Sequence, residues 1–260
     1  MAKNIYGLDI GTSNIKIYHK DKDTFLNEKN IIAIANKTEV FAFGDEAFEM
    51  YEKAPDNIKV SFPVKCGVIA DFDNMQTLFI EFIKKISHDT KKIMPADYYI
   101  AVPTDITEVA GVDVNNAKGI MVVNIGADTT EISVLSLGGI VLSKAVKFGG
   151  NKLDSQIISA VRKKYNLVIG SKTAEYIKCQ LGSAIKQEET TVNVYGRHVV
   201  TGLPTNCTIS SDIVYECLKD FINQIVDSIK SILERTPPEL SADIIDTGIY
   251  LTGGSSAINR

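Results

Sequence analysis

The chain has 260 residues, of which 45% are hydrophobic and 23% charged, and its formal net charge is −4. These values are typical of a soluble globular protein and exclude a general electrostatic attraction to nucleic acid. No apolar run approaches membrane-spanning length, so we expect a cytoplasmic protein with no nucleic-acid partner.

Cysteine and histidine usage predicts neither a disulfide framework nor a structural metal site. The cysteines form no C-x-x-C pair, and the histidines show no ligand spacing. We expect buried or incidental thiols in a reducing compartment. The residues concerned are Cys66, Cys179, Cys207, Cys217, His19, His88 and His198.

The first half of the chain predicts a strand-rich unit with one long helix. A short helix is expected over 44–50, before Pro55. Apolar residues recur with helical spacing over Asp73–Ile86, which Asp73 or Asn74 would cap. Strands are expected at Ile5–Ile10, Ile15–His19, Ile31–Ala35, Val40–Phe43 and Tyr98–Val102.

The second half predicts further strands and three helices. The clearest helix is Asp212–Arg235, which has an apolar stripe and is closed by Pro237-Pro238. Mixed strands and helices of this kind indicate an α/β protein. The other elements expected are a hairpin around 120–134, strands at Ile140–Lys144 and Ile249–Thr252, two short strands within 188–209, and helices at Asn151–Lys164 and Lys172–Ile185.

One motif appears twice, first around Asp9-Ile10-Gly11-Thr12 and again around Asn124-Ile125-Gly126-Ala127. Each copy is an apolar strand, an acidic or amide residue, a spacer, a glycine-containing turn and a second strand. Such a turn lets backbone N–H groups converge on an anion, and an adjacent carboxylate can hold Mg²⁺ through water. An ordinary β-hairpin turn explains one copy equally well. Two copies in one chain favour a pair of phosphate-binding loops.

Short motifs over most of the chain resemble one known group, the ATPase superfamily of actin, hexokinase and heat-shock chaperones. Within it, the chain is similar to the MreB family of bacterial actins. The motifs that carry the likeness are Asp9-Ile10-Gly11-Thr12, Gly44-Asp45-Glu46-Ala47, Gly67-Val68-Ile69-Ala70-Asp71-Phe72, Val102-Pro103 with Ile106-Thr107-Glu108-Val109, Thr201-Gly202-Leu203-Pro204 and Thr236-Pro237-Pro238-Glu239-Leu240.

The resemblance implies an actin-like (ribonuclease H-like) α/β fold of two lobes with mixed sheets, and ATP with Mg²⁺ in the cleft between them. The first lobe would be 1–114, with an inserted subdomain at about 29–71. The second would be 115–260, with an insertion at about 151–213.

The resemblance also implies a set of site residues. It assigns Asp9 and Asn124 to Mg²⁺ through water, and Thr130 to catalysis. Glu175 and Lys178 match an E-x-x-K pair beside the adenosine, although alone they would read as a solvated helix pair. Lys16 is expected to contact the phosphates, but an exposed lysine on a strand is an equally good interpretation. The nucleotide-binding residues expected are Asp9, Gly11, Thr12, Ser13, Asn14, Lys16, Gly126, Ala127, Asp128, Thr129, Gly150, Glu175, Lys178, Gly253, Gly254, Ser255 and Ser256.

The chain departs from the family pattern at the second loop. Asn124 stands where the family has an acidic residue, and an amide cannot supply the charge that favours Mg²⁺. Asp128 stands in a turn that the family builds from glycine, and it brings a negative charge beside the phosphates.

A second departure follows Val109, where the family has on the order of thirty-five more residues that carry the water-orienting Glu. We therefore expect an incomplete first lobe and impaired hydrolysis, with at most a slow actin-type ATPase. The family also continues beyond Asn259-Arg260, so we expect a C-terminally truncated chain.

The resemblance suggests partners as well. Ile93-Met94 match an apolar pair that dips into the membrane in some MreB proteins, and a loop pair packed on its own domain is as good an interpretation. Head-to-tail self-association into filaments, the inner face of the cell membrane and other cell-shape proteins are the partners implied, although the incomplete first lobe makes filaments doubtful.

Three other functions compete with an ATP-binding filament protein of rod shape and cell-wall synthesis. The chain could be a scaffold that keeps the fold without hydrolysis, which Asn124 and the missing segment favour. A small-molecule kinase of the superfamily would need a substrate-binding Asp base, and a chaperone ATPase would need a C-terminal linker. The sequence provides neither feature.

Overall fold

A computed structural model describes residues 4–88, 95–101 and 117–259. The chain divides into two compact units, Met1–Ile106 and Thr107–Arg260.

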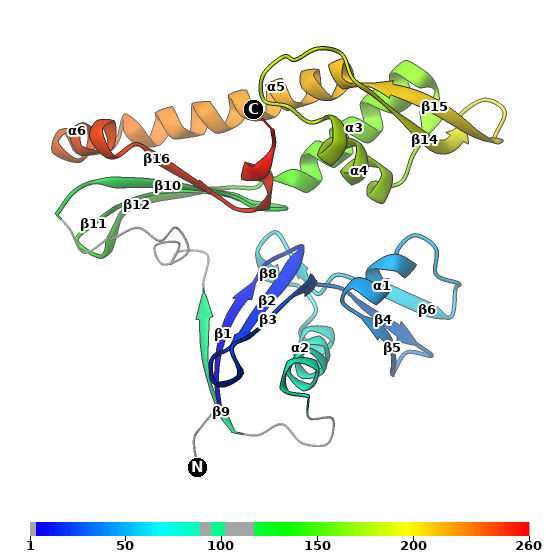
Figure 1. The fold of residues 1–260 in the computed structure, drawn as a ribbon, viewed down its shortest axis with the longest axis horizontal. Coiled ribbons are helices and arrows are strands. Elements are labelled where there is room, and N and C mark those ends of the chain that lie inside the picture. Colours follow the sequence, from blue (N-terminus) through cyan, green and yellow to red (C-terminus); the bar gives the residue numbers. More distant parts are fainter. Residues whose placement is uncertain (1–3, 89–94, 102–116, 260) are drawn as a thin grey trace. The chain divides into compact units, whose positions relative to one another are not determined.

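The first unit is built on a four-stranded sheet with the order β3-β2-β1-β9 (Figure 1). β1 (Asn4–Ile10), β2 (Asn14–His19) and β3 (Thr24–Lys29) are consecutive antiparallel strands, with the short 3₁₀ helix η1 (Lys20–Lys22) between β2 and β3. β9 (Ala96–Ala101) then adds to β1 in parallel. β3 was not predicted from the sequence.

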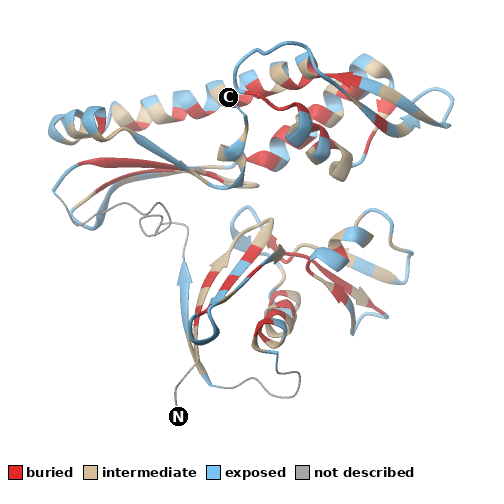
Figure 2. Ribbon diagram, in the orientation of Figure 1, coloured by how far each residue is buried: buried red, intermediate tan, exposed pale blue. Residues whose placement is uncertain are grey.

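A long helix packs on one face of this sheet. α2 (Phe72–Ser87) begins at Asp71, whose side chain accepts a hydrogen bond from the N–H of Asn74, and ends at His88 in a left-handed conformation. Its apolar stripe packs on alternate residues of β1 and β2, which form the buried bands of Figure 2. The core-facing residues include Tyr6, Leu8, Ile15, Ile17, Leu78 and Phe82.

A smaller sheet follows in the same unit. β4 (Ile32–Ala35) lies between β5 (Glu39–Phe43) and β6 (Ile58–Ser61), with α1 (Asp45–Met50) packed beside it. The hairpin of β7 (Val64–Lys65) and β8 (Val68–Ile69) then leads to α2.

The second unit repeats the topology of the first sheet. β10 (Ile120–Ile125), β11 (Thr130–Ser136) and β12 (Gly139–Val146) are antiparallel, and β16 (Ile249–Thr252) adds to β10 in parallel. The order β12-β11-β10-β16 therefore matches β3-β2-β1-β9, strand for strand.

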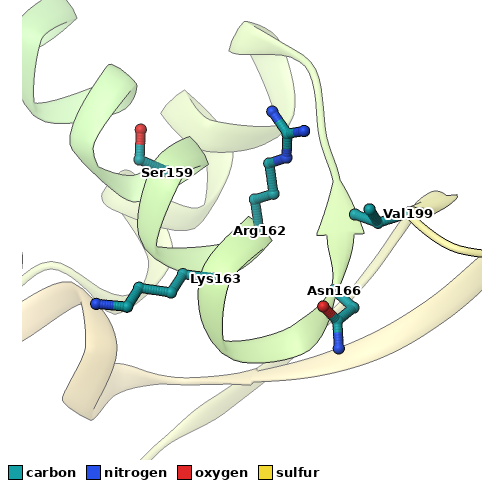
Figure 3. Close-up of a pocket in the computed structure, with 5 residues that line it drawn as sticks. All are labelled: Ser159, Arg162, Lys163, Asn166 and Val199. Carbon is teal, nitrogen blue, oxygen red and sulfur yellow. The ribbon is translucent and has the colours of Figure 1, made fainter.

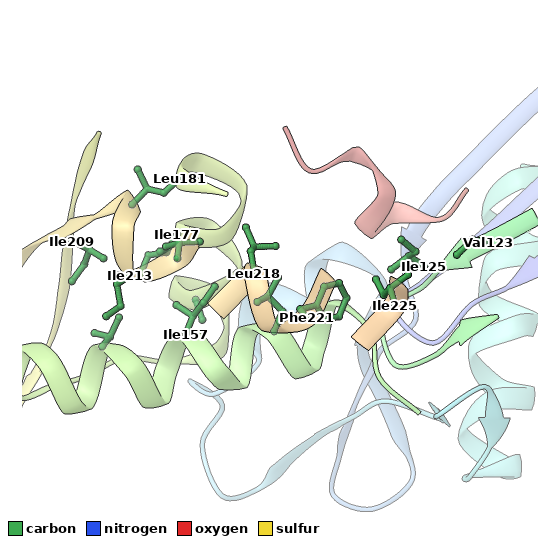
Figure 4. Packing of buried hydrophobic residues seen from close by; sticks show 14 of the residues in the cluster. Val123, Ile125, Ile157, Ile177, Leu181, Ile209, Ile213, Leu218, Phe221 and Ile225 are labelled. Atoms are coloured by element: carbon green, nitrogen blue, oxygen red, sulfur yellow. The ribbon is translucent and has the colours of Figure 1, made fainter. Parts of the chain in front are cut away.

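This sheet and its helices form the largest hydrophobic cluster among the described residues. α5 (Ser211–Leu233) packs against β11, β12 and β15, and α3 (Gly150–Tyr165) packs against α4 (Ser171–Leu181) and α5. Figure 4 shows Ile157, Leu218 and Phe221 packed between these helices. Each such side chain contributes about 1.5–3 kcal/mol on burial, so this core dominates the stability of the unit.

The remaining elements of the second unit are a small sheet and a terminal helix. β13 (Leu167–Val168), β14 (Thr191–His198) and β15 (Pro204–Ser210) form the sheet, and the 3₁₀ helix η2 (Gly254–Ala257) follows β16.

Two predictions for the helices of this unit were wrong. The helix expected to reach Ile185 ends at Leu181, before Gly182, and α6 (Pro238–Thr247) begins where the prolines had predicted only an end.

Candidate functional site

The first hairpin has a tight turn between β1 and β2 that requires glycine. The N–H of Gly11 donates to the carbonyl of Asn14 at 3.0 Å, and a Cβ at Gly11 would lie 2.8 Å from that oxygen. The buried Asn30 donates to the carbonyl of Gly11 from its side chain and to that of Ser13 from its backbone, both at 2.8 Å. Because these bonds hold the loop carbonyls, the loop N–H groups other than that of Gly11 can point toward an anion.

The charged and hydroxyl side chains of this hairpin are already engaged. Lys16 donates to Asp9 across the strands at 2.9 Å, with the two side chains 46% and 44% exposed. A pair so exposed contributes at most about 1 kcal/mol, so a hydrated cation can compete for Asp9. Thr12 accepts from the N–H of Gly67 at 3.2 Å, and Ser13 donates to Asn14 at 3.0 Å.

The second hairpin repeats this turn. The N–H of Gly126 donates to the carbonyl of Thr129 at 2.9 Å. Asn124 lies directly opposite Glu131, in the cross-strand position that Asp9 and Lys16 occupy in the first hairpin. The two sequence copies are therefore one structural device, built once in each unit.

Polar side chains link three neighbouring strands beside the second turn. The hydroxyl of Thr252 donates to Oδ1 of Asn124 at 3.3 Å, and the Asn124 side chain is hydrogen-bonded to Glu131. Burial raises the pKa of Glu131, and the bond from Asn124 partly offsets this rise.

The raised pKa of Glu131 predicts a pH-dependent effect of Glu131→Gln. The folded state binds the proton of Glu131 more tightly than the unfolded chain does, so wild-type stability declines as pH rises above the ordinary pKa of 4.5. Glu131→Gln removes this decline, so we expect its melting temperature, relative to that of the wild type, to be higher at pH 7 than at pH 4.5. Melting curves over this range, with Glu216→Gln on the exposed face of α5 as control, test it. A gain that is the same at both pH values would contradict the assignment.

The second loop is joined to the start of α3. The N–H groups of Gly150 and Asn151 donate to the carbonyls of Gly126 at 3.0 Å and Ala127 at 2.8 Å. The side chain of Asn151 donates to Asp128 at 2.8 Å. Asp128 thus lies beside the positive end of a helix dipole, which compensates its charge near any phosphate.

An ion pair and a serine lie on the other side of this loop. Lys178 on α4 pairs with Asp154 on α3 at 2.8 Å, with the two side chains only 13% and 10% exposed. Ser255 donates to the carbonyl of Gly126 at 3.2 Å, and a Cβ at Gly150 would lie 2.7 Å from its oxygen. Figure 1 shows the strand β16 that leads into this turn next to β10.

The turn after β16 is shaped by glycine. Gly253 has a φ of +88°, and a Cβ there would lie 2.4 Å from the carbonyl oxygen of Ile125 and 2.6 Å from Oδ1 of Asn124. Ser256 donates to the carbonyl of Gly253 at 2.7 Å, which closes the turn. Gly254 has no such restriction, since a Cβ there would meet nothing within 4 Å.

The predicted residues therefore assemble within each unit. One set gathers around the first turn, and the other joins the second turn, Gly150, Lys178 and the 253–256 turn. Glu175 lies one turn before Lys178 on α4.

Thr130 is fully buried and donates to the carbonyl of Phe148 at 2.9 Å, so a catalytic role would require that hydrogen bond to break. Ile93 and Met94 lie outside the described residues.

Three residues of this arrangement were missed from the sequence: Asn30, Glu131 and Asp154. None of them stands out in the sequence, because each lies among other polar or charged residues, as in Glu28-Lys29-Asn30 and Asn151-Lys152-Leu153-Asp154.

A hollow of about 430 Å³ lies elsewhere, at the C-terminal end of α3 (Figure 3). At 1.5 Å per residue its nearest lining residue on α3 is about 14 Å along the helix from Gly150, so it is distinct from the loop site. It is lined by Ser159, Arg162, Lys163, Asn166 and Val199.

The carboxylate and amide oxygens beside the two turns suit a magnesium ion that keeps its water ligands. Within 4–88, 95–101 and 117–259, no group of three or more His, Cys, Asp or Glu side chains is placed to hold a metal. Mg²⁺ on a nucleotide needs only one or two carboxylates besides water and phosphate. Among the described helices, none combines the length and apolarity needed to span a bilayer.

Comparisons with known proteins find bacterial cell-shape proteins. The profile of the MreB/Mbl protein family matches residues 3–111 and 110–260. Cell shape-determining protein Mbl of Bacillus cereus is 39% identical over 287 residues, which cover 97% of this chain and 85% of that protein. Cell shape-determining protein MreB of Escherichia coli is 35% identical over 296 residues, covering 100% and 85%. The crystal structure of MreB 5 of Spiroplasma citri bound to AMPPNP matches with a TM-score of 0.90 and 30% identity, covering 100% of this chain and 87% of that chain.

The same comparisons locate the missing segment. The Escherichia coli alignment has 296 positions and this chain 260 residues, so 296 − 260 = 36 positions have no counterpart here. The family profile matches in two pieces that meet at residues 110 and 111, just after Val109. This agrees with the internal gap predicted from the sequence.

Proposed function

The chain belongs to the MreB/Mbl family, whose matched members are named cell shape-determining proteins, and on this premise we propose that it binds ATP with Mg²⁺ as a cytoskeletal protein. Its fold is actin-like. The observation that carries the proposal is the repeated turn: two hairpins in one chain have the same register and the same Gly N–H bond. The AMPPNP bound to the Spiroplasma relative supports a nucleotide as the ligand.

The chain's own residues would divide the work as follows. Backbone N–H groups within Gly11–Asn14 and Gly126–Thr129, other than those of Gly11 and Gly126 that close the turns, would bind the phosphates, assisted by Lys16. The Gly253–Ser256 turn, Gly150, Glu175 and Lys178 would border the adenosine. Asp9 and the second hairpin would hold Mg²⁺ through water, and the ion would neutralise phosphate charge.

Hydrolysis would be slow in this chain. The absent segment after Val109 carries the Glu that the family uses to orient the attacking water. The hydroxyl of Thr130 donates a hydrogen bond to the carbonyl of Phe148 and so does not orient a water in its place. The chain would then still bind the nucleotide although it hydrolyses it slowly.

Two assays on the purified chain test this function. Calorimetry with ATP and Mg²⁺ should show one site, while phosphate release should stay far below that of an intact MreB measured in parallel. Phosphate release at the intact rate would refute the impaired hydrolysis. Absence of ATP binding would favour the scaffold function, which Asn124 and the missing segment also favour.

We further propose that the protein acts in the cytoplasm at the inner face of the membrane, with a second copy of itself and other cell-shape proteins as partners. Head-to-tail contacts are heterologous and produce filaments rather than closed rings. Each basic residue near an anionic surface contributes about 1 kcal/mol, and a filament would multiply the weak contact made by Lys91 and Lys92.

A double substitution tests the membrane contact. Ile93→Ser with Met94→Ser should abolish pelleting with anionic liposomes, because it removes the apolar pair and leaves the lysines. The control is Val199→Ser with Val200→Ser, an exposed apolar pair on another loop, which should pellet as the wild type does. Unchanged pelleting of the Ile93/Met94 variant would remove the membrane proposal.

A further inference from the structure

The two hairpins carry their carboxylates on opposite strands. In the first, Asp9 is on the leading strand and faces Lys16. In the second, the leading strand carries the neutral Asn124, and the acid is Glu131 on the returning strand. Directly opposed residues of an antiparallel pair project on the same face of the sheet. Each hairpin thus presents one carboxylate at the same cross-strand position.

Both ends of the Asn124 side chain are occupied. A carboxylate only accepts hydrogen bonds, so the amide NH₂ faces Glu131 and the oxygen faces Thr252, which donates to it at 3.3 Å. The same oxygen is crowded by Gly253, where a Cβ would lie only 2.6 Å away. Thr252 therefore uses one of the two lone pairs of this oxygen and Gly253 packs close to it, which leaves Asn124 less available than an unpaired carboxylate oxygen to a metal-bound water.

Glu131 is the group with a vacant acceptor. Its Oε2 is buried and, among the described residues, has no hydrogen-bond partner, whereas Asn124 already holds the carboxylate by its other bond. Leaving such an atom unpaired costs free energy unless a ligand completes it. A hydrated cation beside the Gly126 turn supplies both the missing donor and the missing charge.

We propose that Glu131 is the carboxylate through which the second hairpin contacts the hydrated Mg²⁺ of bound ATP, and that Asn124 is a positioning residue that orients Glu131. This inference rests on the proposed function, and it transfers to Glu131 the Mg²⁺ contact that the family resemblance implied for Asn124.

The test is the affinity for ATP measured by calorimetry in excess Mg²⁺ and in EDTA, expressed as the ratio of the two dissociation constants. Glu131→Gln should reduce the gain from Mg²⁺ about tenfold, with binding in EDTA nearly unchanged. The control Glu216→Gln makes the same charge change on exposed α5 and should keep the wild-type ratio. A wild-type ratio in Glu131→Gln would overturn the proposal.

The positioning role has its own readout. Asn124→Ala should lower the ratio in the wild type and change it little in Glu131→Gln, since one residue acts through the other. Equal effects in both backgrounds would show that Asn124 acts independently. Should Glu131→Gln melt early, Glu131→Asp, which keeps the charge but moves it by one methylene, should also lose the Mg²⁺ gain. A wild type that binds ATP in neither condition would instead refute the proposed function itself.

Discussion

Gly253→Ala is expected to cost about 2–4 kcal/mol of unfolding free energy and to weaken ATP binding at least tenfold. The backbone at Gly253 has a φ of +88°, which an L side chain rarely adopts. The added Cβ would also lie 2.4 Å from the carbonyl oxygen of Ile125, so either the β16 turn or the second loop must move. Urea denaturation gives the first quantity and calorimetry the second.

The neighbouring glycine provides a matched control. Gly254→Ala adds the same methyl group one residue later, where nothing lies within 4 Å, and it should leave stability within about 0.5 kcal/mol of the wild type. If both variants unfold at the same urea concentration as the wild type, the close packing of Gly253 on Asn124 and Ile125 is not present in solution.

Lys178→Met is the second large effect that we expect, a loss of about 3–5 kcal/mol. Lys178 and Asp154 are almost completely buried, and removing the ammonium group leaves the carboxylate of Asp154 in a site of low polarity. Lys178 also donates to the carbonyl of Gly150 at 3.4 Å, so the start of α3 loses a contact beside the second loop. Urea denaturation measures the loss.

Two further variants separate the buried charge from the lost contact. Adding Asp154→Leu to Lys178→Met should recover much of the stability, because no unpaired charge remains. Lys219→Met on the exposed face of α5 should change stability by less than about 0.5 kcal/mol. A Lys178→Met protein as stable as Lys219→Met would show that the pair is solvated.

The helices were predictable where one apolar stripe decides the structure. α2 and α5 bury residues at spacings of three and four, and both lie within two residues of their expected bounds. α6 was missed because Pro237-Pro238 was taken as a stop, although proline at the first helical position also starts a helix. β3 was missed because its exposed Phe25 and charged end conceal the alternation.

The turns of the candidate site were predictable, but their supports were not. Glycine at 11 and 126 is a local requirement that the sequence displays directly. Asn30 bonds to Gly11, 19 residues away, and Asp154 pairs with Lys178, 24 residues away. Such contacts depend on how strands and helices pack, which one sequence without relatives does not reveal.

Amide hydrogen exchange with and without ATP and Mg²⁺ tests the proposal that both hairpins bind one nucleotide. Apart from Gly11 and Gly126, whose N–H groups already close the turns, we predict that amides within Gly11–Asn14 and within Gly126–Thr129 both become protected when the nucleotide is added, and in proportion to the same occupancy. Protection of one hairpin alone, or of neither at saturating ATP, would contradict the account.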